Sequence, residues 1–281
     1  MWKLIGPGGV YAEGSGMGSM VSESFEEGKE SWVPSGSSLA ERLAGYLSDV
    51  PRWLEVRSML LSGRCEVLGL EEREPQPSFV ARELEEGEDQ MVYVVGRPSS
   101  VAIREAARRN RDAGIAMAVP EDASYIEGAL PDWTATRATL HLLGDGPHLP
   151  DLAEGEVEPL GASDLHASWV EDIPEDLRSF LEDSVVGSEA SAAAALEGGR
   201  PVSFCVAWDQ TEGLWDVSID TLEGHRRRGH AARCVSWMVD EMRRRGKEPV
   251  WAAEETNVPS MRLAGRLGFV PVDELVLFRP S

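Results

Sequence analysis

The stretch from Val217 to Ala232 reads VSIDTLEGHRRRGHAA, and it determines much of the architecture. An apolar strand that ends near Leu222 runs into a basic turn over 226–229, and a helix follows at once. The first N–H groups of a helix have no partners inside it, and the helix dipole adds about half a positive charge there. The turn is therefore a candidate anion site, where one phosphate would satisfy several donors.

Small residues and arginines fit the turn to such a ligand. Gly229 lets the backbone come close to an anion without a Cβ in the way, and Ala231 is the next smallest choice. The arginines would add charge-assisted hydrogen bonds. The same residues also fit a solvated basic turn that only begins a helix, and their spacing alone leaves both interpretations open.

The segments on either side of the turn predict alternating strands and helices. Upstream, we expect a helix over 163–169, a hairpin at Gly198-Gly199 and one continuous strand over 214–222. Downstream, a buried-type strand over 249–253 precedes a second helix over 258–267. A natural N-cap residue precedes this helix and a glycine follows it, as is typical of helix ends.

Two motifs in this order resemble the Gcn5-related N-acetyltransferase (GNAT) superfamily. The first is RxxGxA, from Arg226 to Ala231, at the junction of strand and helix. The second is NxxSxxLxxxLGF, from Asn257 to Phe269, with Trp251 between the two motifs. The resemblance covers residues 157–278. It implies an α/β fold (α+β by some schemes) in which helices flank a mixed central sheet.

The resemblance also implies an activity and a set of binding residues. The family transfers an acetyl group from acetyl-coenzyme A (acetyl-CoA) to an amine, by direct attack while both are bound. Main-chain groups of Ile219 and Thr221 would pair with the pantetheine arm. Asn257 and Ser260 would lie where the next helix meets that arm and the thioester. The pyrophosphate would be held by Arg226, Arg227, Arg228, Gly229, His230 and Ala231.

An amine acceptor must lose a proton before it attacks, because a model primary amine has a pKa near ~10. The expected base is a carboxylate, or a water held by one. Asp216 and Asp220 share one face of the strand before the turn and are the candidate catalytic carboxylates. Both also fit solvent exposure or structural hydrogen bonding. The other carboxylates nearby are Glu223, Glu254 and Glu255.

One departure from the family concerns the acid that protonates the departing thiolate. The family often uses a tyrosine after the second motif, but the last tyrosine here is Tyr125. Ser260 or a water is the candidate replacement, unless coenzyme A leaves as the thiolate. Ser260 also fits a simple first-turn helix residue. Two other functions stay open: an acyl-CoA-binding regulatory protein without turnover, and an N-acyltransferase that uses a longer acyl-CoA.

A cluster of chain-breaking residues over 144–150 divides the chain into residues 1–150 and 151–281. After an irregular stretch over 1–38, the first block has the strand–helix–strand–helix–strand order that ends the second, with crossovers long enough for parallel pairing. We therefore expect a degenerate GNAT-like copy, although this alternation is common in α/β proteins. Its counterpart of the basic turn contains Pro98, which lacks an amide donor, so no coenzyme is expected there. Gly14 to Gly18 only superficially resembles a dinucleotide fingerprint.

The composition sets the class of protein. The 281 residues include 27 basic and 49 acidic side chains, for a formal charge of −22, which argues against a general nucleic-acid binder. No apolar run has the length of a membrane-spanning helix, and the first 20 residues lack a secretory pattern. Three scattered cysteines show neither a disulfide framework nor metal-ligand spacing. We expect a cytoplasmic protein without a metal, and the oligomeric state stays open.

The charge is unevenly distributed along the chain. Residues 151–223 hold 2 basic and 18 acidic side chains, whereas residues 224–281 hold 11 basic and 7 acidic ones. By analogy with the family, the acidic segment would help to wall the acceptor cleft. It would steer a cationic amine there, so a small polyamine-like or amino-sugar acceptor is favoured. The acidity also fits a simple contribution to solubility.

Overall fold

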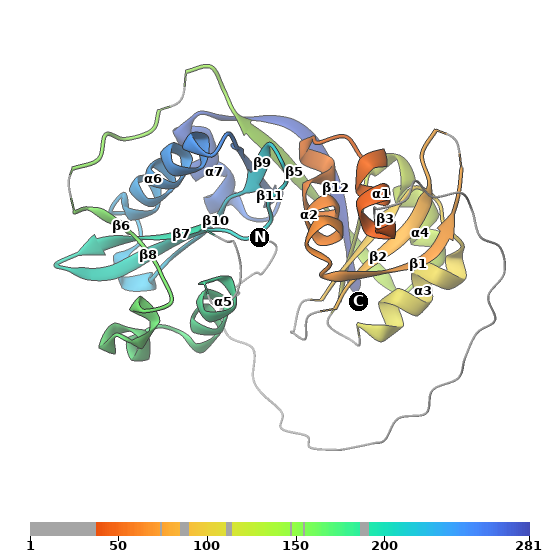
Figure 1. Cartoon of the computed structure of the whole chain (residues 1–281), viewed down its shortest axis with the longest axis horizontal. Helices are drawn as coiled ribbons and strands as arrows, with labels where there is room; N and C mark the ends of the chain where they lie inside the picture. The colour runs from red at the N-terminus through yellow and green to blue at the C-terminus, as the bar shows by residue number, and fades with distance from the viewer. Residues whose placement is uncertain are drawn as a thin grey trace, which may run out of the picture.

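The structure is a computed structural model that describes residues 38–73, 75–84, 90–110, 114–146, 148–153, 155–185 and 191–281. The expectations for the first 37 residues, including Gly14 to Gly18, lie outside this part. Figure 1 shows two lobes that are connected by long strands running between them.

In the N-terminal lobe, helices lie on both faces of a sheet. Helices α1 (Leu39–Tyr46) and α2 (Leu54–Ser62) share a buried apolar cluster with one face. Helices α3 (Ser100–Arg109) and α4 (Ala123–Ala129) share another with the opposite face. The strands of this half of the chain are β1 (Cys65–Glu71), β2 (Ser78–Glu83), β3 (Met91–Val95), β4 (Ile115–Ala118) and β5 (Trp133–Leu143).

The C-terminal lobe is built in the same way. Its strands are β6 (Val157–Pro159), β7 (Ser191–Glu197), β8 (Arg200–Ala207), β9 (Leu214–Asp216), β10 (Ser218–Thr221), β11 (Glu248–Glu254) and β12 (Phe269–Pro280). Helix α6 (His230–Arg244) packs on one face of the β6–β7–β8–β10 sheet, and its apolar stripe of Val235, Met238, Val239 and Met242 is buried there. Helix α5 (Glu175–Val185) packs on the other face. Helix α7 (Val258–Leu267) lies between β11 and β12 in sequence.

The two halves exchange their last strands. The larger sheet has the order β1-β2-β3-β4-β12-β5-β11-β9. Strand β12, from the end of the chain, pairs antiparallel with β4 of the N-terminal half, with Leu277 opposite Met117. Strand β5 in turn pairs antiparallel with β11 of the C-terminal half, with His141 opposite Trp251. The parallel pairing expected within the first block is therefore confirmed for β3 with β4, but it is wrong for β5 with β4, because β12 lies between these two strands.

The strand that leads into the basic turn breaks at Val217 instead of running continuously over 214–222. β9 pairs parallel with β11, whereas β10 pairs antiparallel with β8 in the smaller sheet. Val217 N–H still donates to Val250 O on β11 at 2.9 Å, and Leu222 N–H donates to Val202 O on β8 at 3.0 Å. Because backbone groups alternate sides along a strand, the main-chain groups of Ile219 and Thr221 face away from β8, toward the opening left where β10 departs from β11.

Several local expectations can be compared with the elements. The hairpin at Gly198-Gly199 is confirmed, with φ of 60° and 79° at the two glycines. The helix over 258–267 is confirmed as α7. The helix expected over 163–169 is wrong, since two short 3₁₀ helices, Asp164–His166 and Ser168–Asp172, take its place. None of the described helices has the length and apolar character needed to cross a lipid bilayer.

Candidate functional site

The N-terminus of α6 presents backbone donors at the end of the basic turn. Gly229 is the N-cap residue, and no side chain in the described residues caps this end. The first N–H bonded back into the helix is that of Arg233, which donates to Gly229 O at 3.1 Å. The N–H groups of His230, Ala231 and Ala232 therefore point out of the helix end. This is the geometry that an anion such as a diphosphate requires.

Gly229 allows a backbone conformation that residues with a side chain rarely adopt. Gly229 has φ of 87°, and Arg227 also lies in the left-handed region with φ of 63°. A Cβ at Gly229 would meet only the guanidinium of Arg233 at 3.5 Å, which is ordinary contact. A side chain would therefore be strained by the positive φ, and it would stand on the surface that a bound anion approaches.

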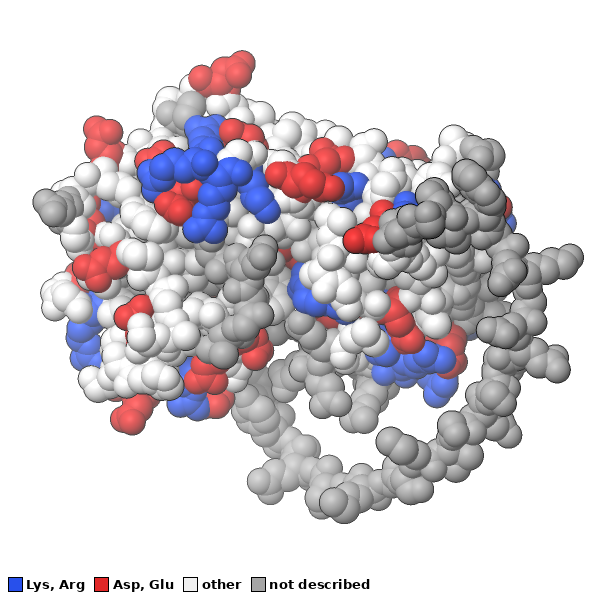
Figure 2. Space-filling model, viewed as in Figure 1, with Lys and Arg blue, Asp and Glu red and all other residues white. Residues whose placement is uncertain are grey.

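The arginines of the turn point to different partners. Arg226 Nε donates to Thr221 O at 3.0 Å, and Arg228 donates to Glu197 Oε1 at 2.8 Å. Arg227 is exposed. The His230 side chain is buried, and burial lowers its pKa, so this residue offers its main-chain N–H to the turn rather than a charged ring. Figure 2 shows Lys and Arg side chains gathered over α6 and α7, so the basic character of residues 224–281 is also visible on the surface.

Asp220 lies on the face of β10 that α5 covers. Its cross-strand partner Phe204 and its second neighbour Leu222 both pack in the cluster that contains Leu177 of α5. Thr221 N–H donates to its Oδ1 at 2.5 Å. Burial raises the pKa of Asp220 even though this hydrogen bond and the charge of Arg226 oppose it. A half-buried carboxylate with a raised pKa beside the open edge of a strand is suited to accepting a proton.

Of the other carboxylates, Asp216 and Glu254 are committed to structure, whereas Glu223 and Glu255 are exposed. Asp216 is buried, its Oδ1 accepts from Asp209 N–H at 2.8 Å, and its own N–H donates to Asp209 O at 3.0 Å. Asp216 therefore closes the loop between β8 and β9. Glu254 is also buried and receives two hydrogen bonds from Arg279 at 2.7 and 3.1 Å. Glu223 is an exposed turn residue. The geometry thus favours Asp220 among the carboxylates near the turn.

Asn257 and Ser260 lie together at the start of α7. Asn257 caps the helix, because its Oδ1 accepts from Ser260 N–H at 3.2 Å. The buried Trp251 donates from Nε1 to Ser260 Oγ at 2.9 Å. Ser260 acts as an acceptor in this contact, which leaves its hydroxyl hydrogen for another group. Both residues therefore have a structural role that does not conflict with contact to a ligand.

The equivalent turn in the N-terminal half is built differently. Ser99 caps α3 by accepting from Ala102 N–H at 3.3 Å, and Tyr125 OH donates to Pro98 O at 2.6 Å. Arg97 N–H donates to Ser78 Oγ at 3.2 Å. Strand β3 pairs with both β2 and β4, so the sheet stays continuous beside this turn. Two donors at this turn, the N–H groups of Arg97 and Ala102, are thus used within the protein.

Two residues near the site could not be found from the sequence. Glu197 holds Arg228 from the end of β7, 31 positions away in the chain. Asp176 of α5 acts electrostatically on Asp220 and raises its pKa further. Neither lies in a motif, and only the packing of α5 and of the β7–β8 hairpin brings them to the turn.

Comparisons with known proteins bear on the family and the fold. Residues 171–278 match the family model described as GNAT acetyltransferase. A search of curated proteins found no match. Among solved structures, a GCN5-related N-acetyltransferase-like protein from Streptococcus suis is 17% identical with a TM-score of 0.58, over 86% of this chain and 98% of the other.

Two further structures extend the likeness over both halves. A GCN5-related N-acetyltransferase from Kribbella flavida is 17% identical with a TM-score of 0.53, over 88% of this chain and 97% of the other. A tandem GNAT protein from the clavulanic acid biosynthesis pathway is 14% identical with a TM-score of 0.53, over 85% and 93% of the two chains. At these identities the likeness establishes the fold, a mixed sheet flanked by helices as predicted. By the match of its family model, the part of the chain from 171 to 278 is a domain of the GNAT acetyltransferase family.

Proposed function

We propose that this protein is an acetyl-CoA-dependent N-acetyltransferase, which transfers the acetyl group to a primary amine by direct attack while donor and acceptor are both bound. The family match supports acyl transfer in general. The observation that carries the proposal is the uncapped N-terminus of α6, at the end of a strand whose outer edge is left open by the break at Val217. This combination offers donors for a diphosphate and an outer strand edge for an extended arm, at which the Thr221 N–H and O now bond to the side chains of Asp220 and Arg226.

Each residue has a part in the proposed reaction. The thioester supplies an activated acetyl group, whose carbon forms a bond to the amine nitrogen as its bond to sulfur breaks. The N–H groups of His230 and Ala231 hold the diphosphate, and the edge of β10 at Ile219 and Thr221 orients the arm. Asp220 accepts the proton that the amine loses, directly or through a water. Ser260 or a water returns a proton to the departing sulfur.

We propose a small cationic amine as the acceptor. Asp176 and Asp220 interact electrostatically across the face between α5 and β10, and residues 171–183 add further exposed carboxylates. A protonated amine would be attracted to this region before it gives up its proton. An anionic amine would be repelled, so acceptor charge is a sharp test of this part of the proposal.

We propose that the N-terminal half is a degenerate copy of the same domain that binds no coenzyme. The side-chain cap on α3, where Ser99 accepts from Ala102 N–H, and the continuous sheet beside this turn support this division of roles. The tandem GNAT protein from the clavulanic acid biosynthesis pathway matches 85% of this chain over 93% of its own length. The two-domain division at 150 and a cytoplasmic location belong to the same proposal.

The test is release of free coenzyme A thiol from acetyl-CoA in the presence of a panel of amines. We expect release only when an amine is present, with cationic amines turned over faster than anionic ones. Asp220→Asn should abolish most of this turnover, and Asp240→Asn, an exposed α6 variant, should not. Either of two results would contradict the proposal and indicate a different function. Binding of acetyl-CoA without turnover of any amine indicates a regulatory acyl-CoA-binding protein, and turnover only with a longer acyl-CoA indicates another acyltransferase.

A further inference from the structure

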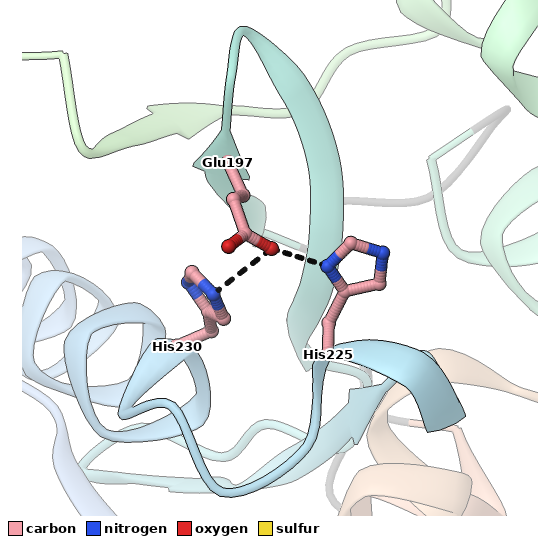
Figure 3. Close-up of side chains that lie close together, drawn as sticks. All are labelled: Glu197, His225 and His230. Carbon is pink, nitrogen blue, oxygen red and sulfur yellow. Dashed lines mark hydrogen bonds and ion pairs between the residues drawn. The ribbon is translucent and has the colours of Figure 1, made fainter.

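Three side chains with metal-binding atoms converge beside the basic turn. Glu197 ends β7, His225 lies in the 3₁₀ helix Glu223–His225, and His230 is the first residue of α6. Their ligand atoms all lie within 4.8 Å of one another. Figure 3 shows the carboxylate of Glu197 between the two imidazole rings, which approach it from opposite sides. Glu197 Oε2 already contacts His225 Nδ1.

The third member of the cluster lacks a partner. His230 is only 5% exposed, and its buried Nε2 has no hydrogen-bond partner among the described residues. This nitrogen points at Glu197 Oε2 from 3.6 Å, which is too long for a hydrogen bond. Buried polar atoms are nearly always satisfied, so an unpaired ring nitrogen aimed at a carboxylate indicates that a further group belongs between them.

We propose that Glu197, His225 and His230 bind a divalent transition-metal ion, and that Zn²⁺ is the ion that suits them. Two imidazole nitrogens and one carboxylate oxygen form a ligand set that zinc uses in proteins, with bonds of about 2.0–2.2 Å. The ion replaces the proton between His225 and Glu197 and gives His230 Nε2 its missing partner. This site goes against the sequence expectation of no metal, because Glu197 is 28 positions away from His225 and only the fold joins them.

The neighbouring arginines make the site testable. Ligation through Nε2 leaves the ring proton of His230 on Nδ1, and Arg233 now lies 3.1 Å from that nitrogen. The Arg233 side chain must therefore move away from His230 Nδ1. It can then pair with Glu156, whose Oε1 lies 4.0 Å from Arg233 Nε. Arg228 pairs with the other carboxylate oxygen of Glu197, Oε1, at 2.8 Å. Its positive charge repels a bound metal cation and so weakens metal binding. A bound ion would tie the end of β7 to both sides of the basic turn.

The experiment uses the full chain, stripped with a chelator and dialysed, and measures Zn²⁺ binding by calorimetry and by competition with a chromophoric zinc indicator. We expect one equivalent per chain. His225→Ala and His230→Ala should each weaken binding by at least about 100-fold, since even partners of ligands are worth up to that much. His148→Ala, an exposed histidine outside the cluster, should bind as the wild type does. Arg228→Gln should bind more tightly, because it removes a competing cation.

Two further readouts distinguish this site from a cysteine site and from misfolding of the variants. Substituted Co²⁺ should show visible ligand-field bands without the charge-transfer absorption of a thiolate, because burial raises the pKa of Cys234 to about 12. Thermal melts of the variants in chelator should match the wild type, which shows that they fold. The proposal is overturned if the stripped protein binds no Zn²⁺, if both histidine variants bind normally, or if a thiolate band appears. Coenzyme A takes no part in these measurements, so their failure is independent of the proposed activity.

Discussion

Asp216 and Asp220 are four positions apart on what looks like one strand face, yet their environments give them different roles. Asp216 is buried against the β8–β9 loop and accepts the Asp209 N–H. Asp220 lies beyond the break at Val217, on the face that α5 covers, and keeps partial access to solvent. From the sequence, both aspartates are candidate bases, because no residue pattern marks the break of the strand at Val217. Only the position of each carboxylate in the fold separates them.

The first prediction concerns Asp220→Asn. Removal of a general base should lower kcat by about 10²–10⁴-fold, with little change in the Kd for coenzyme A. Because burial raises the pKa of Asp220, the acidic limb of the wild-type kcat profile should lie at higher pH than an exposed aspartate would give. This limb should disappear in the variant. Steady-state kinetics across pH, beside calorimetry of coenzyme A binding, make the check, and a retained limb contradicts the role.

The first prediction also includes the sign of a stability change, which follows from the same raised pKa of Asp220. The folded state holds the Asp220 proton more tightly than the unfolded chain does, so this group stabilises the fold at low pH. That contribution is lost as the pH rises from the unfolded pKa through the folded one. Asp220→Asn, which stays neutral, should therefore unfold at a higher temperature than the wild type at neutral pH. A lower melting temperature at neutral pH would contradict the burial argument.

A second prediction concerns the acceptor and uses Asp176→Asn. Loss of this carboxylate should raise the KM for a cationic amine several-fold, since a charge pair at effective dielectric near 20 is worth up to a few kcal/mol before screening. Affinity for coenzyme A should not change. Glu248→Gln, at the start of β11, serves as a matched control for a lost surface carboxylate. Equal KM values for wild type and Asp176→Asn would remove the case for a cationic acceptor.

At the scale of elements, local signals predict some segments well and others poorly. Helix α7 has an N-cap at Asn257 and a C-terminal Gly268 with φ of 90°, so both ends are encoded locally. The β1–β2 hairpin has no clear local signal, because β1 is half-exposed on both faces and shows no clean alternation. β12 begins as early as Phe269, since a bulge between Pro271 and Asp273 accommodates the proline.

A third prediction compares two ion pairs on neighbouring strands. Arg279 on β12 pairs with buried Glu254 on β11, whereas Arg137 on β5 pairs with exposed Glu274 on β12. Arg279→Ala leaves a buried carboxylate without its cation and should cost roughly 3–5 kcal/mol of unfolding free energy. Arg137→Ala should cost at most about 1 kcal/mol. Chemical denaturation measures both, and equal losses would contradict the assigned burial.

At the scale of the whole molecule, the exchange of β5 and β12 defines the architecture. Each half completes its sheet with the last strand of the other, and β5 pairs with β12 from Trp133–Pro280 to Leu143–Phe269. The sequence predicts two similar blocks but not this exchange, because pairing between distant strands depends on contacts that no local pattern encodes. Further contacts join the halves, including Arg64 with Asp209 at 2.6 Å and Thr211 with Asp49 at 2.6 Å.

A fourth prediction follows from this shared sheet. Calorimetric unfolding of the full chain should show one cooperative transition, since neither half can keep its sheet after the other unfolds. Residues 151–281 produced alone would lack β4 and β5, the two strands that pair with β12. This fragment should therefore not fold stably. Two separate transitions in the full chain, or a folded and monomeric C-terminal fragment, would show that the halves are independent.

The backbone donors at the start of α6 carry the proposed function, and isothermal calorimetry of coenzyme A binding tests them. We predict one site per chain. Gly229→Val combined with Ala231→Val should weaken binding by at least about tenfold, since a left-handed φ costs a β-carbon residue roughly 1–2 kcal/mol and the new side chains cover the donors. Gly224→Ala, whose added Cβ meets open space, should bind normally. No binding to the wild type, or unchanged binding in the double variant, would contradict a diphosphate site at this helix end.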